Sequence, residues 1–273
     1  RPPFDDVRVR KALAYLLHRE KMNRTLMYNA YFLHRSFFED LYTQKNPCEN
    51  AFYEYDKEKA RALLSEAGWK ANPETGLLEK EGKSFTIQFL ARSATEDKFL
   101  AIYEEDLKDV GIKIEVVKKD WAAWSKDMEA YNFDMTWAAW SAGIFKNPEP
   151  MWLSTEAERP SGQNIPGYKN PKVDELIAKQ RAIFDVDRRH DLVRQIDRLV
   201  SADVPYILLW NLNYRRLLYW NKFGMPATVL GRTGDERAAY WLWWHDEDAA
   251  ADLEQAMKDG KSLPRKPAKV VFD

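Results

Sequence analysis

Residues 85–117 constrain the fold more than any other part of the chain. A strand-like run from Phe85 to Leu90 precedes a helical stretch from about Glu96 to Val110, and Ile112 to Val117 has the pattern of another strand. Gly111 stands where the helix has to stop. Two strands joined by a helix form a βαβ unit, in which both strands lie parallel in one sheet. The chain is therefore predicted to be α/β.

The alternation of strands and helices continues on both sides of this unit. Helices are predicted after Asp5 or Asp6, after Asp56 and from Trp121 to about Ala130, because aspartate is a favoured N-cap. The remaining predicted elements are a hairpin of 77–80 with 84–91, strands at 134–140 and 204–210, and helices from Asn170, at 187–201 and at 248–258. We expect a mixed sheet flanked by helices, followed by a looser aromatic segment.

Five of the eleven tryptophans lie between residues 120 and 152. Tryptophan has a large rigid face and one N–H donor, so a group of tryptophans suits the capture of a flexible ligand. Trp121 and Trp124 have helical spacing, which also fits the buried stripe of a short helix. In a strand, Trp137 and Trp140 point to opposite faces, so at most one belongs to any single core. We interpret the cluster as a recognition wall, with core packing as the alternative.

Composition excludes several classes of partner and site. Forty-two basic and forty-three acidic residues nearly cancel, so no overall field attracts nucleic acid or an anionic membrane. Cys48 is the only cysteine, and the four histidines lack the spacing of metal ligands. We therefore expect no cofactor, no metal and no nucleic-acid partner. The chain begins at Arg1 without an apolar leader, and we expect any export signal to lie outside it.

The sequence lacks the motifs of covalent catalysis and phosphate binding. It has no Gly-x-Ser-x-Gly, and residues 76–84 place five residues between two glycines where a phosphate-binding loop has four. Asp120, Asp127, Glu129 and Asp134 offer carboxylates near tryptophans, as a glycosidase requires. Helix caps and exposed helix faces explain them more simply. The protein is predicted not to be an enzyme, and a carbohydrate-binding or glycan-acting protein is the alternative function.

Several segments share one pattern and follow one another in a fixed order. They are Phe4–Leu13, Tyr55–Trp69, Leu107–Glu115, Tyr131–Met135 and Gly167–Leu176. Together they resemble the periplasmic solute-binding proteins of family 5, which are the oligopeptide- and dipeptide-binding components of ABC importers. Residues 22–31 and 162–168 are most similar to the YejA-type branch of that family.

The resemblance implies a two-lobed periplasmic binding protein of type II-like architecture. Residues 1–209 would be its C-terminal ligand-binding lobe, and residues 210–273 would be a returning segment that completes the missing N-terminal lobe. Such a receptor captures peptides or peptide-like compounds in the periplasm of a Gram-negative bacterium. It then delivers them to the permease subunits of an ABC importer.

The resemblance also implies which residues face the ligand. By matching position they are Tyr31, Trp137, Trp140, Phe145, Asn147 and Asn164. Core packing is the alternative for Trp137, and turn stabilisation is the alternative for both asparagines. Family members carry a Trp-x-x-Asp signature whose carboxylate meets the ligand amine, but Gly143 occupies that position here. Either another acid replaces it, with Glu149 nearest in sequence, or the ligand has a blocked or differently placed terminus.

Overall fold

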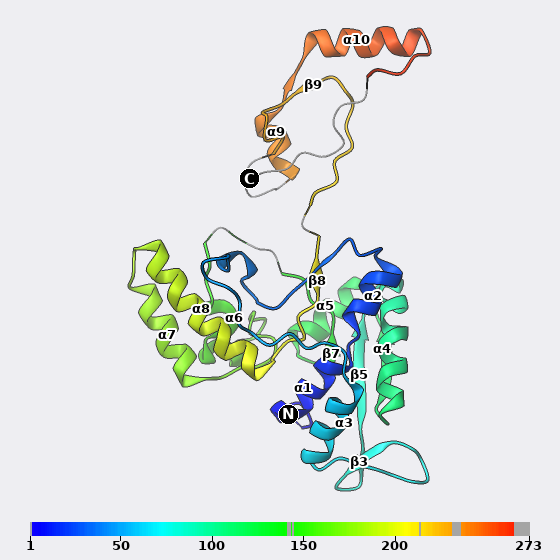
Figure 1. Cartoon of the computed structure of the whole chain (residues 1–273), viewed down its shortest axis with the longest axis vertical. Helices are drawn as coiled ribbons and strands as arrows, with labels where there is room; N and C mark the ends of the chain where they lie inside the picture. The colour runs from blue at the N-terminus through cyan, green and yellow to red at the C-terminus, as the bar shows by residue number, and fades with distance from the viewer. Residues whose placement is uncertain (1, 141–142, 144, 213, 231–235, 265–273) are drawn as a thin grey trace. The chain divides into compact units, whose positions relative to one another are not determined.

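The computed structural model describes residues 2–140, 143, 145–212, 214–230 and 236–264 (Figure 1). The chain divides into two compact units, one of residues 1–141 with 145–211 and the other of residues 142–144 with 212–273. The assignment of residues 210–273 to a second lobe stays a prediction. Within the described ranges, no helix combines the length and the apolar character needed to cross a membrane.

A three-stranded parallel sheet forms the centre of the first unit. β5 (Thr86–Ala91) lies between β6 (Lys113–Lys118) and β7 (Met135–Thr136), and both neighbours run parallel to it. Helix α4 (Asp97–Asp109) joins β5 to β6 and runs alongside the sheet in Figure 1, while α5 (Trp121–Glu129) joins β6 to β7. The predicted βαβ unit is confirmed, as is the α/β class.

The N-terminal helices pack against this sheet layer. They are α1 (Val7–Leu16), α2 (Arg19–Leu26) and α3 (Lys57–Glu66), and α1 contacts both α3 and α4. As predicted, the side chains of Asp6 and Asp56 cap α1 and α3. The core they share with the sheet includes Leu13, Leu16, Met22, Leu64, Phe85, Ile87, Phe89 and Leu107. Gly111 ends α4 with φ of +85°, and a Cβ there would meet the carbonyl oxygen of Gly76 at 2.7 Å. Only glycine fits that helix stop.

Antiparallel pairs lie in small separate sheets. β2 (Lys70–Ala71), β3 (Leu78–Lys80) and β4 (Lys83–Ser84) form one, and β1 (Phe32–Leu33) with β8 (Trp210–Asn211) forms another. The predicted hairpin is therefore β3 with β4, whereas β5 belongs to the parallel sheet. Parallel and antiparallel strands both occur, and helices flank the sheets.

Two predicted strands are much shorter than expected. The run 134–140 pairs only at Met135 and Thr136, opposite Phe89 and Leu90 near the end of β5. In the run 204–210, only Trp210 is in a strand. Val204 adopts the left-handed conformation, with φ of 49°, where it caps a helix, and the following proline has no N–H to donate. The alternation of residues along the sequence does not predict either ending. The first depends on pairing with β5, and the second depends on where α8 (Val186–Asp203) ends.

Helices α6 (Glu149–Trp152), α7 (Pro171–Arg181) and α8 (Val186–Asp203) build a second core in the same unit. The predicted N-cap Asn170 accepts a hydrogen bond from the backbone N–H of Lys172. Buried side chains of this core are Trp152, Tyr168, Val173, Leu176, Ile177, Ile196 and Val200. Single-turn 3-10 helices lie at Glu39–Leu41, Ala94–Glu96 and, somewhat longer, Ser154–Glu158.

The second unit contains short elements. β9 (Phe223–Gly224) pairs antiparallel with β10 (Trp244–His245), and α9 (Ala239–Leu242) follows a 3-10 turn at Glu236–Ala238. α10 (Glu247–Lys258) confirms the predicted late helix. Neither α9 nor α10 buries a side chain, and the unit exposes Trp220, Tyr240, Trp241 and Trp244.

Candidate ligand-binding site

The three parallel strands end at one edge of their sheet. β5, β6 and β7 stop at Ala91, Lys118 and Thr136, and we call residues 91–93, 118–124 and 136–140 the carboxyl edge. In open α/β sheets, ligands bind outside the carboxyl ends of the strands, because the loops that follow the strands converge there. This edge is therefore where a binding site is expected from the topology alone.

Two tryptophans and an arginine form a layered group at the carboxyl edge, which we call the Trp–Arg stack. The rings of Trp121 and Trp124 are stacked, with centroids 5.3 Å apart and planes 24° apart. The guanidinium of Arg92 lies 5.4 Å from the Trp121 ring and 5.2 Å from the Trp124 ring. Cation–π attraction holds such a cation on indole faces. Trp121 nevertheless remains 63% exposed, which leaves a large aromatic surface for a ligand.

Hydrogen bonds fix the stack to two strands. Trp124 Nε1 donates to Thr136 Oγ1 at 3.3 Å, and Thr136 Oγ1 donates to the carbonyl of Leu90 at 2.8 Å. The side chain of Asp120 caps α5 by accepting from the backbone N–H of Ala123 at 2.9 Å. Because these bonds order the stack, a ligand has less conformational entropy to remove when it binds.

Trp137 forms the floor of the carboxyl edge rather than its surface. It is partly buried against the first core, with ring centroids 5.7 Å from Phe89 and 6.1 Å from Trp210. Its Nε1 is buried and has no hydrogen-bond acceptor among the described residues. Packing therefore accounts for most of what Trp137 does, and its role toward a ligand stays a prediction.

Three of the predicted site residues, Trp140, Phe145 and Asn147, are exposed. Trp140 is 43% exposed and lies edge-on to Tyr206 with centroids 6.4 Å apart, while Phe145 is 76% exposed. Asn147 is also exposed, and its Oδ1 accepts from the backbone N–H of Glu149 at 3.2 Å. That bond matches the turn-stabilising alternative for Asn147.

Tyr31 and Asn164 have their polar groups engaged within the fold. The backbone of Tyr31 exchanges two hydrogen bonds with the side chain of Asn23, and its ring packs against the first core. Asn164 is fully buried, with Nδ2 donating to the carbonyls of Leu153 and Tyr168 and Oδ1 accepting from the Tyr168 N–H. Asn164 thus closes a turn, and in this structure its amide is saturated.

Sequence reasoning missed Arg92, and it left Trp121 undecided. The alternative that Trp121 belongs to a buried stripe is wrong, because α5 buries none of its residues. Their positions in the sequence could have pointed to them, because Arg92 directly follows β5 and Trp121 lies three residues after the end of β6. That signal becomes useful only when both strands are known to be parallel neighbours.

The carboxylates near the tryptophans have structural partners. Asp120 caps α5, Asp134 accepts from the backbone N–H of Gln88 at 2.8 Å, and a hydrogen bond from Lys119 lowers the pKa of Asp127. Glu149, the acid nearest to Gly143, forms an ion pair with Arg181. Glu149 is thus already paired, which weakens it as a replacement for the missing amine ligand.

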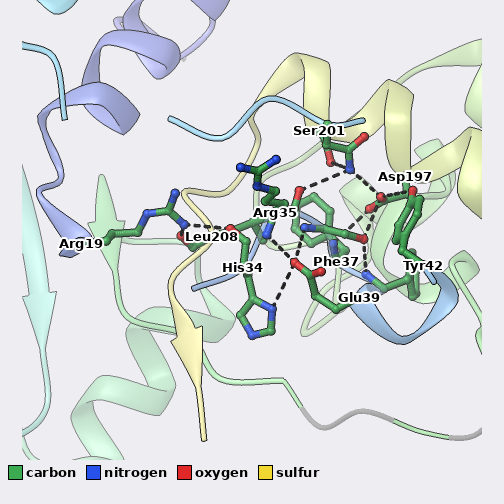
Figure 2. Close-up of polar contacts among 12 residues, drawn as sticks. Arg19, His34, Arg35, Phe37, Glu39, Tyr42, Asp197, Ser201 and Leu208 are labelled. Atoms are coloured by element: carbon green, nitrogen blue, oxygen red, sulfur yellow. Dashed lines mark hydrogen bonds and ion pairs between the residues drawn. The ribbon is translucent and has the colours of Figure 1, made fainter. Parts of the chain in front are cut away.

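A buried polar network ties the segment 36–50 to α8 (Figure 2). Asp197 has no exposed surface, and its carboxylate accepts from Ser36 Oγ at 2.8 Å and from Tyr42 OH at 2.7 Å. It also accepts from the Phe37 N–H at 3.0 Å and from Asn50 Nδ2 at 2.6 Å. Burial outweighs these bonds and raises the pKa of Asp197. The network positions the Phe37 ring against the second core, 4.7 Å from the Trp152 ring.

The fold resembles that of solute-binding proteins, and the sequence places the chain in one family of them. Residues 1–161, more than half of the chain, match the bacterial extracellular solute-binding proteins, family 5 Middle. The chain belongs to this family, whose members are binding proteins rather than enzymes. The predicted resemblance is thereby confirmed.

Individual relatives agree with this assignment. Protein YejA of Escherichia coli is 26% identical over 96% of this chain and 48% of its own length. The oligopeptide-binding protein AppA of Bacillus subtilis is 28% identical over 88% of this chain and 44% of its own length. The structure of AppA with a nonapeptide superimposes with a TM-score of 0.74 at 22% identity, covering 89% of this chain and 48% of that one. The chain thus spans about half the length of these relatives.

Another similar fold carries a different ligand. A periplasmic oligopeptide-binding protein of Thermotoga maritima, solved with bound mannohexaose, has a TM-score of 0.66 at 23% identity. It covers 77% of this chain and 42% of that one. Similarity at this level establishes the fold, and the ligand of the present chain has to be argued from its own residues.

Proposed function

We propose that this chain supplies one wall of an extracytoplasmic receptor that captures peptides or peptide-like compounds for an ABC importer. A missing N-terminal lobe would supply the opposite wall, and the receptor would work in the periplasm of a Gram-negative bacterium. The observation that carries the proposal is the Trp–Arg stack, an ordered aromatic surface at the carboxyl edge of the parallel strands. Membership of the solute-binding family and similarity to AppA support it.

The chemistry of the stack fits a ligand with varied side chains. Exposed Trp121 offers dispersion contact without demanding a particular polar partner, and Trp140 and Phe145 add further apolar surface. Charged groups of the carboxyl edge have partners within the fold, because Arg92 pairs with Glu96 and Asp120 caps α5. Lys118 and Lys119 pair with Asp97 and Asp127. A flexible, chemically varied peptide suits this surface better than a ligand that requires many fixed hydrogen bonds.

We expect Trp121→Ala, in the full-length receptor, to weaken peptide binding at least tenfold. Truncating an aromatic anchor in a binding site commonly costs about 2 kcal/mol or more, and 1.4 kcal/mol corresponds to a factor of ten. Because Trp121 is largely exposed, the free energy of unfolding should change by less than about 1 kcal/mol. Isothermal titration calorimetry with a peptide mixture, together with urea unfolding, measures both quantities.

Phe184→Ala is the matched control, because Phe184 is 98% exposed in the connection between α7 and α8 and lies outside the carboxyl edge. It should leave the peptide Kd unchanged. Equal affinity of Trp121→Ala and the parent receptor would remove Trp121 from the site. Saturable binding of mannohexaose but of no peptide would instead favour the carbohydrate alternative.

A further inference from the structure

One side of the Trp121 indole is covered, and the other side is open. The ring centroids of Trp121 and Trp124 lie 5.3 Å apart, and the Arg92 guanidinium lies 5.4 Å from the first ring and 5.2 Å from the second. These nearly equal distances form a near-equilateral triangle, so Trp124 and Arg92 approach Trp121 from the same side. Trp121 is still 63% exposed, and its exposed surface therefore lies mainly on the opposite side, which we call the open face.

The open face is held in a fixed orientation before a ligand arrives. Trp124, whose ring plane is 24° from that of Trp121, donates from Nε1 to Thr136 Oγ1 at 3.3 Å. Arg92 Nε lies 3.7 Å from Glu96 Oε1, and the Glu96 side chain is only 14% exposed. Both neighbours of Trp121 are thus tied to other parts of the fold. A flat apolar surface that is already ordered loses little entropy when a ligand covers it.

The charges around the open face are engaged within the fold. Arg92 pairs with Glu96, Lys119 pairs with Asp127, and Asp120 caps α5. A charged ligand side chain at this place would lose its water and would have to compete with these existing partners. A second cation on the same indole would also repel Arg92, which already interacts with the ring. A neutral side chain therefore fits the open face better than a charged one.

Among neutral side chains, an aromatic ring matches the open face best. Offset-stacked aromatic rings attract each other beyond the effect of the area that they bury, whereas an aliphatic side chain gains only from burial. Trp121 and Trp124 already lie nearly parallel, so a ligand ring on the open face would continue the same arrangement.

We propose that the open face of Trp121 is a subsite for an aromatic side chain of the bound peptide, which becomes the third layer of the Trp–Arg stack. This inference rests on the proposed function and narrows it at one position of the ligand. Phenylalanine, tyrosine or tryptophan at that position should bind more tightly than leucine, and lysine should bind less tightly than any of them.

The test begins with the peptides that the full-length receptor selects. A mixture of short peptides of random sequence is passed over the immobilised receptor, and the retained peptides are sequenced by mass spectrometry. We expect aromatic residues to be enriched about threefold or more at one position, as the added attraction between stacked rings predicts.

A retained peptide is then resynthesised with cyclohexylalanine in place of that aromatic residue, and calorimetry gives the Kd of both peptides. Cyclohexylalanine has a similar size but no flat π-face, so its Kd for the parent receptor should be about threefold or more higher. Trp121→Leu should bind the two peptides equally, because leucine keeps apolar area but offers no ring for stacking.

Phe184→Leu is the matched control, since it makes a similar aromatic-to-leucine change at a 98% exposed ring outside the carboxyl edge. It should keep the preference of the parent receptor. A preference that survives in Trp121→Leu would overturn the inference, and so would a parent receptor that binds peptides without favouring aromatic residues. Both results would leave the proposed function standing. Binding of no peptide at all would contradict the proposed function itself, and the subsite with it.

Discussion

Replacing Asp197 by alanine is expected to lower the free energy of unfolding by roughly 3–4 kcal/mol. The carboxylate is fully buried, and its loss leaves the hydroxyls of Ser36 and Tyr42 and the Phe37 N–H without their acceptor. The Asn50 amide also loses a bond, although it still donates to Ser201 Oγ. Each unsatisfied buried donor costs about 1–3 kcal/mol, and partial rearrangement keeps the total below the sum. Urea unfolding followed by circular dichroism measures the change.

Asp191→Ala on the same helix is the matched control. Its side chain is 64% exposed and, among the residues that the structure describes, pairs only with Arg194. The variant should therefore cost less than about 1 kcal/mol of unfolding free energy. Similar values for both variants would show that the buried network contributes little to stability.

The contribution of Asp197 to stability should depend on pH, and the direction follows from its raised pKa. Since burial raises its pKa, the folded chain binds a proton at Asp197 more readily than the unfolded chain does. Its contribution to stability is therefore largest below the ordinary aspartate pKa and declines as pH rises through the raised folded value. The difference in unfolding free energy between the parent and Asp197→Ala should therefore become smaller as pH rises from the ordinary aspartate pKa through the raised pKa of folded Asp197.

Trp152→Ala is expected to cost roughly 3–5 kcal/mol of unfolding free energy, as deletions of large aromatic side chains from cores do. Trp152 has no exposed surface, and its ring centroid lies 4.7 Å from Phe37 and 5.7 Å from both Tyr168 and Tyr206. The cavity left by the indole cannot be refilled by neighbours that the second core already holds in place. Thermal and urea unfolding of the variant check this.

Trp121→Ala is the control for Trp152→Ala in the same unfolding measurements. A loss below about 1 kcal/mol there, beside the large loss for Trp152→Ala, would separate core tryptophan from surface tryptophan. If Trp152→Ala were equally mild, the second core would be far less tightly packed than the contacts of Trp152 imply.

The sequence predicted those features whose cause is local. Asp6, Asp56 and Asp120 cap helices where expected, because an N-cap acts on N–H groups two or three residues away. Gly111 ends α4 for an equally local reason. The parallel arrangement of β5 and β6 followed from their single connecting helix.

Features that depend on distant segments were not predictable. Asp197 looks like one more polar residue of α8 until Ser36 and Asn50, about 150 residues earlier, close over it. The sequence suggests that the tryptophans of residues 120–152 form one recognition wall. In the structure they have different surroundings, because Trp152 lies in a core and Trp121 lies at the surface. Spacing within the cluster carries no information about which core each indole meets.

Photocrosslinking of a peptide to the full-length receptor tests most directly whether ligand binds at the carboxyl edge. A peptide mixture that carries benzoylphenylalanine at each position in turn would be bound, irradiated and mapped by mass spectrometry. We expect labelled residues within 91–93, 118–124 and 136–140, and we expect excess unlabelled peptide to suppress the labelling. Competable labelling confined to the opposite end of the strands, around Phe85 and Ile112, would contradict the binding site that we propose at the carboxyl edge.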